Sequence, residues 1–477
     1  MQRYLTNSQM RSADNYTINT LGVPSETLMR RAGLAIAEEV LAVADGKTIL
    51  VVCGTGNNGG DGYVCSQILL QKGVNVSVYA MQGRLSADCE REKLRYTGGY
   101  STQICGDIIV DCLFGTGLCR EVGGEYAEVI NKINASGAYV ISADIPSGIN
   151  GDNGLKMNVA VKANLTVAIA EYKLGFILGD GMDYCGKVIK KDIGICLNED
   201  TFAEVFEGED IAEFYPARPR NSHKGTFGTA TLICGCTKYV GAAVLATEAA
   251  LRSGCGYVKL DCSAAVKRTV APALPQTVFS KSDNLKSDAI AIGMGSGVSK
   301  SLYEKISYLL KNYTGTLIID ADGLNTLSKY GVNILKGKKC GVILTPHAKE
   351  FSRLTGIEVK QILSSPVEYA QKFSSEYGVT LLLKGAASVI CGDGKTYINT
   401  TGCTALAKAG SGDMLSGYMC GVAARGVKPL YAAVCSQYML GLAAEIAAEK
   451  SNEYTAIAGD ILQNLSEAVT RTIKYKN

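Results

Sequence analysis

The sequence predicts an α/β protein with two domains, each built as a parallel β-sheet covered by helices on both faces. The chain has 477 residues, and domains commonly contain about 100–200 residues. Short apolar runs end in Gly-rich turns and are followed by longer helical stretches. The apolar residues within these runs are continuous rather than alternating, which is typical of strands buried on both faces.

The same pattern occurs in two blocks. The strands expected in the first block are residues 48–53, 75–80, 108–112, 138–143 and 165–170. Those expected in the second block are residues 229–234, 257–261, 289–292, 316–319, 341–344 and 380–383. Between the blocks, residues 197–222 change from acidic to a Pro-Ala-Arg-Pro-Arg sequence. Such a change indicates a domain boundary, and we expect domains at 1–213 and 214–477.

Composition excludes several classes of protein. The net charge is +3 and 19% of residues are charged, without clusters of Lys and Arg interleaved with aromatics, so we expect no nucleic-acid partner. The most apolar long stretch, 430–447, contains Ser436, Gln437 and Glu445 and is expected to be a core helix rather than a membrane span. The 17 Cys lie mostly in apolar runs, beside only 2 His. Buried reduced thiols in a cytoplasmic protein explain them better than zinc or disulfides.

The first block contains a Gly-rich motif between a strand and a helix. It runs Cys-Gly-Thr-Gly-Asn-Asn-Gly-Gly-Asp-Gly from Cys53 to Gly62. Glycines allow close approach of an anion, and a helix N-terminus offers unpaired N–H groups. The motif lacks the Lys-Ser/Thr pair of a triphosphate loop and the spacing of the dinucleotide fingerprint. A tight strand-to-helix turn with capping Asn and Asp is the alternative.

Two further motifs of this block lie at strand ends. Asp111-Cys-Leu-Phe-Gly115 continues through Thr116, Gly117 and Leu118 to Arg120, which suits a phosphate beside a cation. Asp144 precedes the turn Ile-Pro-Ser147-Gly and could act as a general acid or base. A helix or turn cap is the alternative for Asp144.

Together with Asn7-Ser-Gln-Met10 to Asp14, Leu28-Met29 and Ala32-Gly33, these motifs make roughly the first 210 residues resemble the NAD(P)H-hydrate epimerase family, whose fold is Rossmann-like. Arg30 and Arg31 depart from the family pattern, which has a Glu and a variable residue there.

The resemblance implies a substrate, hydrated NADH or NADPH, that carries a hydroxyl on C6 of the nicotinamide ring in two epimers. It implies a potassium ion held by Asn58, Asp111 and Ser147, and Asp144 as acid/base and substrate contact, supported by Lys173. The remaining substrate contacts that it implies are Asn57, Asn58, Gly59, Gly60, Asp61, Gly115, Thr116, Gly117, Leu118 and Arg120.

In the second block, several strand ends carry polar or Gly-rich loops. They include His223-Lys224-Gly225, Gly293-Met-Gly295-Ser-Gly297, Asp320-Ala-Asp322-Gly323, Thr345-Pro-His347 and Lys384-Gly-Ala-Ala-Ser388. The most specific is Gly410-Ser411-Gly412-Asp413, which opens a helix. N–H groups there can stabilise a transferring phosphoryl group while Asp413 accepts a proton. A helix cap is the alternative for Asp413.

In this order the loops resemble the ADP-dependent NAD(P)H-hydrate dehydratase family, which has a ribokinase-like fold, from about residue 220 to the end. Ala348-Lys349 replaces an expected Pro-Gly, and Ser411 replaces an Ala or Thr. The resemblance implies that Ala242, Gly295, His347 and Asp413 contact the hydrated cofactor, and that Asp413 is the catalytic base. Nucleotide, as ADP with Mg²⁺, would be held by Lys384, Gly385, Ala386, Ala387, Ser388 and Gly412.

The combined interpretation is a bifunctional repair enzyme. One domain would interconvert the two epimers, and the other would dehydrate the S epimer while converting ADP to AMP and phosphate. We expect a cytoplasmic homo-oligomer. A small-molecule kinase with an accessory dinucleotide-binding domain is one alternative, and a non-enzymatic dinucleotide sensor or scaffold is another.

Overall fold

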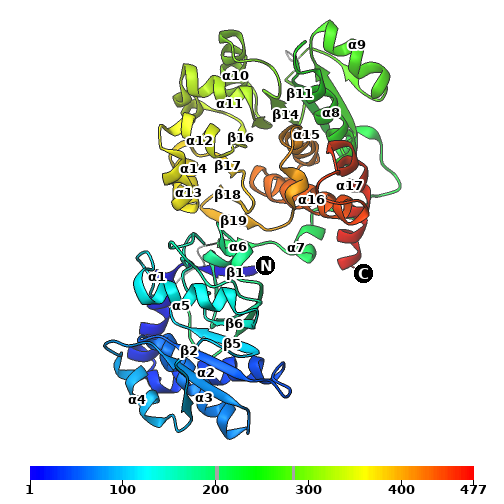
Figure 1. Cartoon of the computed structure of the whole chain (residues 1–477). Coiled ribbons are helices and arrows are strands. Elements are labelled where there is room, and N and C mark those ends of the chain that lie inside the picture. The colour runs from blue at the N-terminus through cyan, green and yellow to red at the C-terminus, as the bar shows by residue number, and fades with distance from the viewer. Residues whose placement is uncertain (199–202, 282–284, 477) are drawn as a thin grey trace. The chain divides into compact units, whose positions relative to one another are not determined.

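The computed structural model describes residues 1–198, 203–281 and 285–476. It divides into two compact units, residues 3–203 and residues 204–477 together with 1–2. Both units are layered α/β structures (Figure 1), as the sequence predicts. Residues 199–202, within the expected linker, lie outside the described residues. Strand β10 and helix α7 belong to the C-terminal unit, where Ile211 and Ala212 are buried. The cut between 213 and 214 stays a prediction.

The N-terminal unit has a seven-stranded sheet in the order β4-β3-β2-β5-β6-β7-β9, with every pair parallel. Strands β1 and β8 pair in parallel and do not belong to this seven-stranded sheet. The strands are β1 (Gln2–Leu5), β2 (Ile49–Cys53), β3 (Val76–Ala80), β4 (Gly99–Tyr100), β5 (Ile108–Cys112), β6 (Tyr139–Ala143), β7 (Leu165–Ile169), β8 (Tyr172–Lys173) and β9 (Lys187–Lys191). The helices are α1 (Asn7–Asn15), α2 (Ser25–Leu41), α3 (Asn57–Gln71), α4 (Ala87–Arg95), α5 (Gly124–Ala135) and α6 (Gly181–Tyr184).

Strand β2 shows why its apolar run is continuous. Ile49, Val51 and Cys53 pack into one core with residues of α2 and α3. Leu50 and Val52 point to the other face and pack with residues of α5. Alternate residues of a strand face opposite sides of a sheet, so both sets must be apolar when helices cover both faces.

The C-terminal unit also has a mainly parallel sheet, but antiparallel strands follow the parallel ones at one end. Its strand order is β13-β12-β11-β14-β15-β16-β17-β18-β19, and β10 pairs with β19. The strands are β10 (Ala203–Val205), β11 (Thr229–Ile233), β12 (Tyr257–Asp261), β13 (Val278–Phe279), β14 (Ala289–Ile292), β15 (Thr316–Ile319), β16 (Gly341–Leu344), β17 (Thr380–Leu383), β18 (Ser388–Gly392) and β19 (Lys395–Asn399). The strands from β13 to β17 are parallel, whereas β18 and β19 are antiparallel.

Helices cover both faces of this sheet, with α10–α14 on one side and α8 and α15–α17 on the other (Figure 1). They are α7 (Gly208–Ala212), α8 (Val240–Arg252), α9 (Ala264–Ala273), α10 (Lys300–Asn312), α11 (Asp322–Tyr330), α12 (Ala348–Thr355), α13 (Val359–Ser364), α14 (Pro366–Tyr377), α15 (Ser411–Ala424), α16 (Pro429–Lys450) and α17 (Ala458–Ile473). Helix α16 is the one described helix long and apolar enough to span a membrane, but 83% of its apolar window is buried inside the protein. It is therefore a core helix, as expected.

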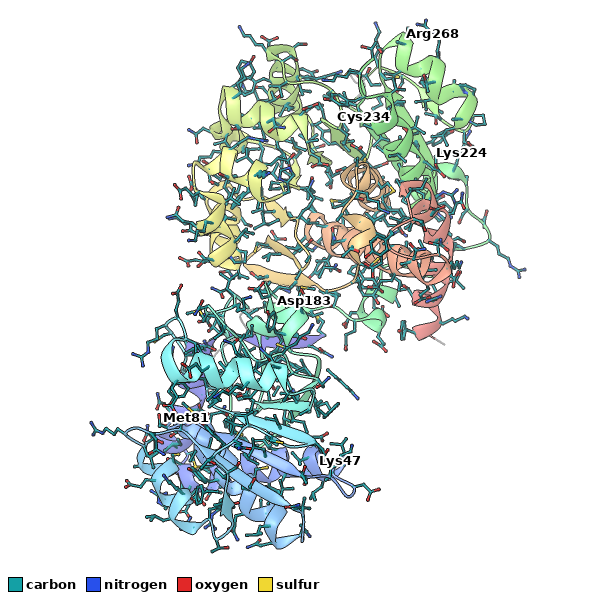
Figure 2. The ribbon with its side chains drawn as sticks, in the orientation of Figure 1. Lys47, Met81, Asp183, Lys224, Cys234 and Arg268 are labelled. Carbon is teal, nitrogen blue, oxygen red and sulfur yellow. The ribbon has the colours of Figure 1, made fainter. Side chains whose placement is uncertain are left out.

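The antiparallel hairpin of β18 and β19 was not predicted. Its turn contains Asp393 and Gly394, both with positive φ (49° and 73°). Asp-Gly with two positive φ values is a common two-residue hairpin turn, and it was the available signal. The thiols follow the prediction in part: Cys53, Cys112 and Cys234 are buried and free, whereas Cys105, Cys119 and Cys196 are free but exposed. Figure 2 labels Cys234, which directly follows β11.

Candidate active sites

A cavity of about 700 Å³ lies at the carboxyl edge of the N-terminal sheet. Ligands of open α/β sheets bind at this edge. Most of the predicted residues line it: Asn57, Asn58, Asp61, Gly115, Thr116, Gly117, Leu118, Arg120 and Asp144. Gly59 and Gly60 are buried and do not line the cavity. A Cβ on Gly59 would lie 2.1 Å from the carbonyl oxygen of Gly54, so close packing of the start of α3 requires glycine there.

Asp144 is held in place by its backbone and by two neighbours. It follows β6 with a φ of 65°, which a non-Gly residue rarely adopts. Its Oδ1 lies 2.5 Å from the Nζ of Lys173, and its Oδ2 accepts a hydrogen bond of 3.1 Å from the Thr116 N–H. Lys173 is buried and also donates to the Ile169 carbonyl at 2.6 Å. The expected support from Lys173 is thus a direct ion pair.

Two of the three predicted cation ligands, Asp111 and Ser147, contact each other, and the third, Asn58, lines the cavity. Ser147 donates to Asp111 from both its N–H (2.9 Å) and its Oγ (2.6 Å), and Ser142 Oγ donates at 2.9 Å. Burial raises the pKa of Asp111, although these hydrogen bonds oppose the shift. The Oδ1 of Asn58 is buried and has no hydrogen-bond partner among the described residues. A buried oxygen without a partner is costly, and a hard cation is a ligand that would satisfy it.

Three further carboxyls, Asp14, Asp61 and Asp88, line this cavity. Asp88 is paired with Arg91 at 3.0 Å. Burial, and then the nearby charge of Asp144, raises the pKa of Asp14 to about 6. Burial and the same neighbour raise the pKa of Asp61 well above its usual range. Sequence reasoning quoted Asp14 only as the end of a motif. The four-residue spacing of Met10 and Asp14, which places both on one helix face, was the signal that could have found it.

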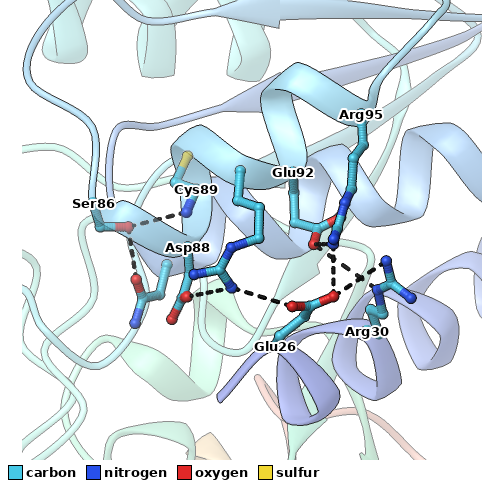
Figure 3. Close-up of polar contacts among 9 residues, drawn as sticks. Glu26, Arg30, Ser86, Asp88, Cys89, Glu92 and Arg95 are labelled. Atoms are coloured by element: carbon cyan, nitrogen blue, oxygen red, sulfur yellow. Dashed lines mark hydrogen bonds and ion pairs between the residues drawn. The ribbon is translucent and has the colours of Figure 1, made fainter. Parts of the chain in front are cut away.

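Figure 3 shows what replaces the expected Glu at position 30. The guanidinium of Arg30 lies 3.3 Å from Glu26 and 3.9 Å from Glu92 of α4. Arg95 bridges the same two carboxylates at 2.8 and 2.6 Å. At the cavity rim, Ser86 Oγ donates to Asn57 Oδ1 at 2.7 Å. Arg30 therefore joins α2 to α4 through shared carboxylates. The other unexpected arginine, Arg31, donates to the Ile193 carbonyl at 3.0 Å.

In the C-terminal unit, three predicted or neighbouring side chains meet at the strand ends. Asp320 follows β15 and is buried; its Oδ1 lies 2.9 Å from the Nζ of Lys384, which follows β17. Ser416 Oγ on α15 donates to the other Asp320 oxygen at 2.7 Å. Burial raises the pKa of Asp413 to about 6, and the charge of Asp320 adds to the shift while that of Lys384 opposes it.

Lys384 is a predicted nucleotide contact, and its ammonium is already paired. Its burial opposes protonation, but the carboxylates of Asp320 and Glu350 outweigh this and raise the pKa of Lys384. The Glu350 carboxylate lies 3.9 Å from the Lys384 Nζ. Gly412 lies beside this group, because a Cβ added there would be 3.5 Å from the Nζ of Lys384.

The sequence placed His347 in a loop after a strand. In the structure it is the N-cap residue of α12. Its Nδ1 accepts hydrogen bonds from the N–H groups of Lys349 and Glu350 at the start of α12. Burial and the nearby charge of Lys384 lower the pKa of His347. Its outer edge remains exposed, with 49% of the side chain accessible, so the ring could contact a ligand while it caps the helix.

The other predicted contacts of this unit lie on two separate loops. Gly295 adjoins Ala242, because a Cβ on Gly295 would lie 2.9 Å from that of Ala242. Gly385, Ala386 and Ala387 form the turn after β17, which Ser388 closes by exchanging 3.3 Å hydrogen bonds with Gly385. No described contact joins Ala242 or Gly295 to Lys384. Asp413, Lys384 and the capping His347 are the predicted residues that lie near one another at these strand ends.

Comparisons with known proteins agree with both halves. Residues 230–469 match the NAD(P)H-hydrate dehydratase family model, and residues 25–175 match that of the YjeF-related protein N-terminus. A bifunctional NAD(P)H-hydrate repair enzyme of Thermofilum pendens is 32% identical over 97% of this chain and 95% of its own length. One of Moorella thermoacetica is 32% identical over 98% of this chain and 97% of its own.

The chain belongs to the bifunctional NAD(P)H-hydrate repair enzyme family. Among solved structures, the ADP/ATP-dependent NAD(P)H-hydrate dehydratase of Bacillus subtilis, co-crystallised with ATP/Mg²⁺, is 31% identical. It covers 57% of this chain and 99% of its own, with a TM-score of 0.52. The predicted repair family and the ribokinase-like fold of the C-terminal unit are thereby confirmed.

Proposed function

We propose that the two units perform the two repair reactions at separate sites. The N-terminal cavity interconverts the R and S epimers of hydrated NADH or NADPH. The strand ends of the C-terminal unit dehydrate the S epimer with ADP, giving AMP and phosphate. The observation that carries this proposal is that each half contains its own carboxylate–lysine pair at strand ends, Asp144 with Lys173 and Asp320 with Lys384.

In the C-terminal unit, hydroxide is a poor leaving group, and its phosphorylation makes departure possible. Asp413 would accept the proton of the attacking C6 hydroxyl, and general-base catalysis of this kind contributes roughly 10²–10⁴-fold. The N–H groups at the start of α15, near Gly412, would face the transferring phosphoryl group. Lys384, Gly385, Ala386, Ala387 and Ser388 would hold the nucleotide, while Ala242, Gly295 and His347 would contact the hydrated cofactor. Mg²⁺ bound with ADP would neutralise phosphate charge.

In the N-terminal unit, Asp144 would act as acid and base on the C6 hydroxyl, with Lys173 and the Thr116 N–H fixing its position. Asn57 to Asp61 and Gly115 to Arg120 would hold the rest of the cofactor. Asn58, Asp111 and Ser147 would hold a potassium ion. The unpartnered Asn58 Oδ1 and the absence of His or Cys from this ligand set favour a hard cation.

Paired substitutions test the division of labour. Asp413→Asn should abolish ADP-driven dehydration and leave epimer interconversion intact. Asp144→Asn should do the reverse, so that only the S epimer is consumed rapidly. Recovery of reduced-nicotinamide absorbance and chromatography of the epimers measure the two reactions. A loss of less than tenfold, about 1.4 kcal/mol in barrier, would make either residue a cap rather than a proton-transfer group. Accumulation of a phosphorylated product without elimination would favour the kinase alternative.

Potassium has a test that needs no substrate. K⁺, but not Na⁺ at equal ionic strength, should raise the thermal midpoint of the N-terminal unit, because a ligand that binds only the folded state stabilises it. Asn58→Leu should remove this response, whereas Asn131→Leu, at an exposed position of α5, tests for nonspecific effects. Equal responses to the two cations would contradict the assignment.

Separate expression of residues 1–213 and 214–477 tests the proposed boundary. Each fragment should be soluble with one activity. A cytoplasmic location and a homo-oligomeric state are proposed as well; fractionation of cells and light scattering of the full chain would test them.

A further inference from the structure

One carboxyl of the N-terminal cavity has no role in the proposed function so far. Asp14 lies on α1, a different element from the β6 end that carries Asp144 and from the β8 strand that carries Lys173. It lines the same cavity as these two residues. Among the described residues, neither a hydrogen bond nor an ion pair holds its carboxyl. A half-buried carboxyl without a partner is not explained by stability.

Epimerisation at C6 sets a requirement that one carboxyl cannot meet. The two epimers carry the hydroxyl on opposite faces of the ring. If the hydroxyl leaves from one face and water adds to the other, a proton must be delivered on one face and removed on the other. A single fixed side chain such as Asp144, held by Lys173 and Thr116, reaches only one face of a bound ring.

We propose that Asp14 and Asp144 form a two-group proton-transfer pair, each serving one face of the nicotinamide ring. The proposal rests on the epimerase function proposed above. The protonated group gives its proton to the C6 hydroxyl, the C6–O bond breaks, and water departs. The lone pair of ring N1 forms a C6=N1 iminium. A solvent water adds to the opposite face and gives a proton to the other carboxylate.

The step is balanced. One water leaves and one enters, one proton is given and one is taken, and nothing is oxidised or reduced. The proton has moved from one carboxyl to the other, so the enzyme is left ready to act on the opposite epimer. The reverse reaction, from the opposite epimer, uses the same two groups with their roles exchanged.

The charges around the cavity suit one protonated and one ionised carboxyl. Lys173 compensates Asp144 directly. Burial and the charge of Asp144 raise the pKa of Asp14 to about 6, while Lys173 opposes the shift. The other charged or titratable side chains that line the cavity are Arg11, Asp61, Asp88, Cys119 and Arg120. Near neutral pH, Asp14 can therefore be found in both forms, which a group that alternates between acid and base needs.

Oxygen exchange separates this arrangement from a single catalytic group. Each purified epimer is incubated in H₂¹⁸O with the full-length protein, without ADP, and label and epimer identity are followed by chromatography with mass detection. The wild-type protein should interconvert the epimers and label both. Asp14→Asn should slow interconversion at least 100-fold but still allow label to enter one epimer, because Asp144 can expel and return water on its own face. Asp144→Asn should label the opposite epimer.

Controls distinguish the possible failures. Asp45→Asn removes an exposed carboxylate outside the cavity and should match the wild type. If the wild-type protein does not interconvert epimers, the proposed function fails and not only this inference. The inference is overturned if Asp14→Asn interconverts within threefold of the wild type, labels both epimers, or labels neither while its thermal midpoint is unchanged. If Asp14→Asn does not fold, Asp14→Glu must still label both epimers, and failure to do so also overturns the inference.

Discussion

The carboxyl of Asp413 lowers the stability of the C-terminal unit at the pH at which it can act as a base. Its pKa is raised from 3.8 to about 6, first by burial and then by the charge of Asp320. A folded-state pKa above the unfolded value means that ionisation opposes folding. The destabilisation is absent near pH 3, develops between about pH 4 and 6, and is complete above pH 6.

The size of the effect follows from the shift. Each pKa unit corresponds to about 1.4 kcal/mol, so this shift corresponds to roughly 3 kcal/mol at pH 8. The first turn of α15 favours the carboxylate by about 0.3–1 kcal/mol, which an amide would largely lose. Asp413→Asn should therefore stabilise the C-terminal unit by about 2 kcal/mol at pH 8, and by less than about 1 kcal/mol near pH 4. For a unit of this size, the thermal midpoint at pH 8 should rise by roughly 4–8 °C.

Calorimetry of the full chain measures the change in the thermal midpoint of the C-terminal unit, with the two units followed as separate transitions. Glu304→Gln, an exposed carboxylate on α10, is the matched control and should change the midpoint little at either pH. An Asp413→Asn protein that is less stable than the wild type at pH 8, or that is stabilised equally at pH 4 and 8, would refute the reasoning. A variant that loses dehydration while gaining stability is the signature of a group placed for chemistry.

Four further substitutions test local packing, surface charge and backbone strain. Gly417→Ala should destabilise the C-terminal unit by more than about 2 kcal/mol, because its Cβ would lie 2.0 Å from the Ala246 carbonyl oxygen of α8. Gly459→Ala in α17, where a Cβ would have nothing within 4 Å, should stabilise the unit by about 0.5–1 kcal/mol. Equal effects of the two substitutions in urea denaturation would contradict this reasoning. Arg30→Glu should lower the free energy of unfolding of the N-terminal unit by about 1 kcal/mol at low salt and by less in 1 M NaCl, because it places a third carboxylate beside those of Glu26 and Glu92. A loss of stability that does not depend on salt would exclude the charge explanation. Ala321→Gly should stabilise by up to about 2 kcal/mol, because Ala321 has a φ of 50°, and a destabilised variant would show that this backbone is not strained.

The sequence predicted the parallel strands well because their chemistry is local. A run such as Ile108–Cys112 is apolar at every position, which only a strand covered on both faces requires. The β18–β19 hairpin was not predicted because its only local signal is the two-residue turn Asp393-Gly394. Short β8 and β13 have two residues each, too few for any periodic pattern.

At the sites, residue types at strand ends could be predicted from the sequence, but their contact partners could not. The Asp144–Lys173 ion pair joins β6 to β8 and depends on the φ of 65° at Asp144, which no composition or spacing encodes. A lone Asp on a helix is no local signal of a site, and only the cavity places Asp14 near Asp144 and Lys173. The Asp320–Lys384 pair spans 64 positions of sequence, and the register of parallel strands, not local pattern, brings it together.

Both units solve the same electrostatic problem in the same way. Each holds a carboxylate at a strand end against the ammonium of a lysine from another strand end, at 2.5 Å for Asp144 and 2.9 Å for Asp320. Beside each pair lies a second carboxyl whose pKa is about 6, Asp14 in one unit and Asp413 in the other. Two carboxylates close together in a partly buried site do not both ionise freely. A lysine compensates the charge of the paired carboxylate in each unit. Ionisation of the neighbouring carboxyl is then the unfavourable step, so the pKa of that carboxyl rises toward neutral pH. A proton can then be accepted and released there with little change in free energy, which is what acid–base chemistry at neutral pH requires.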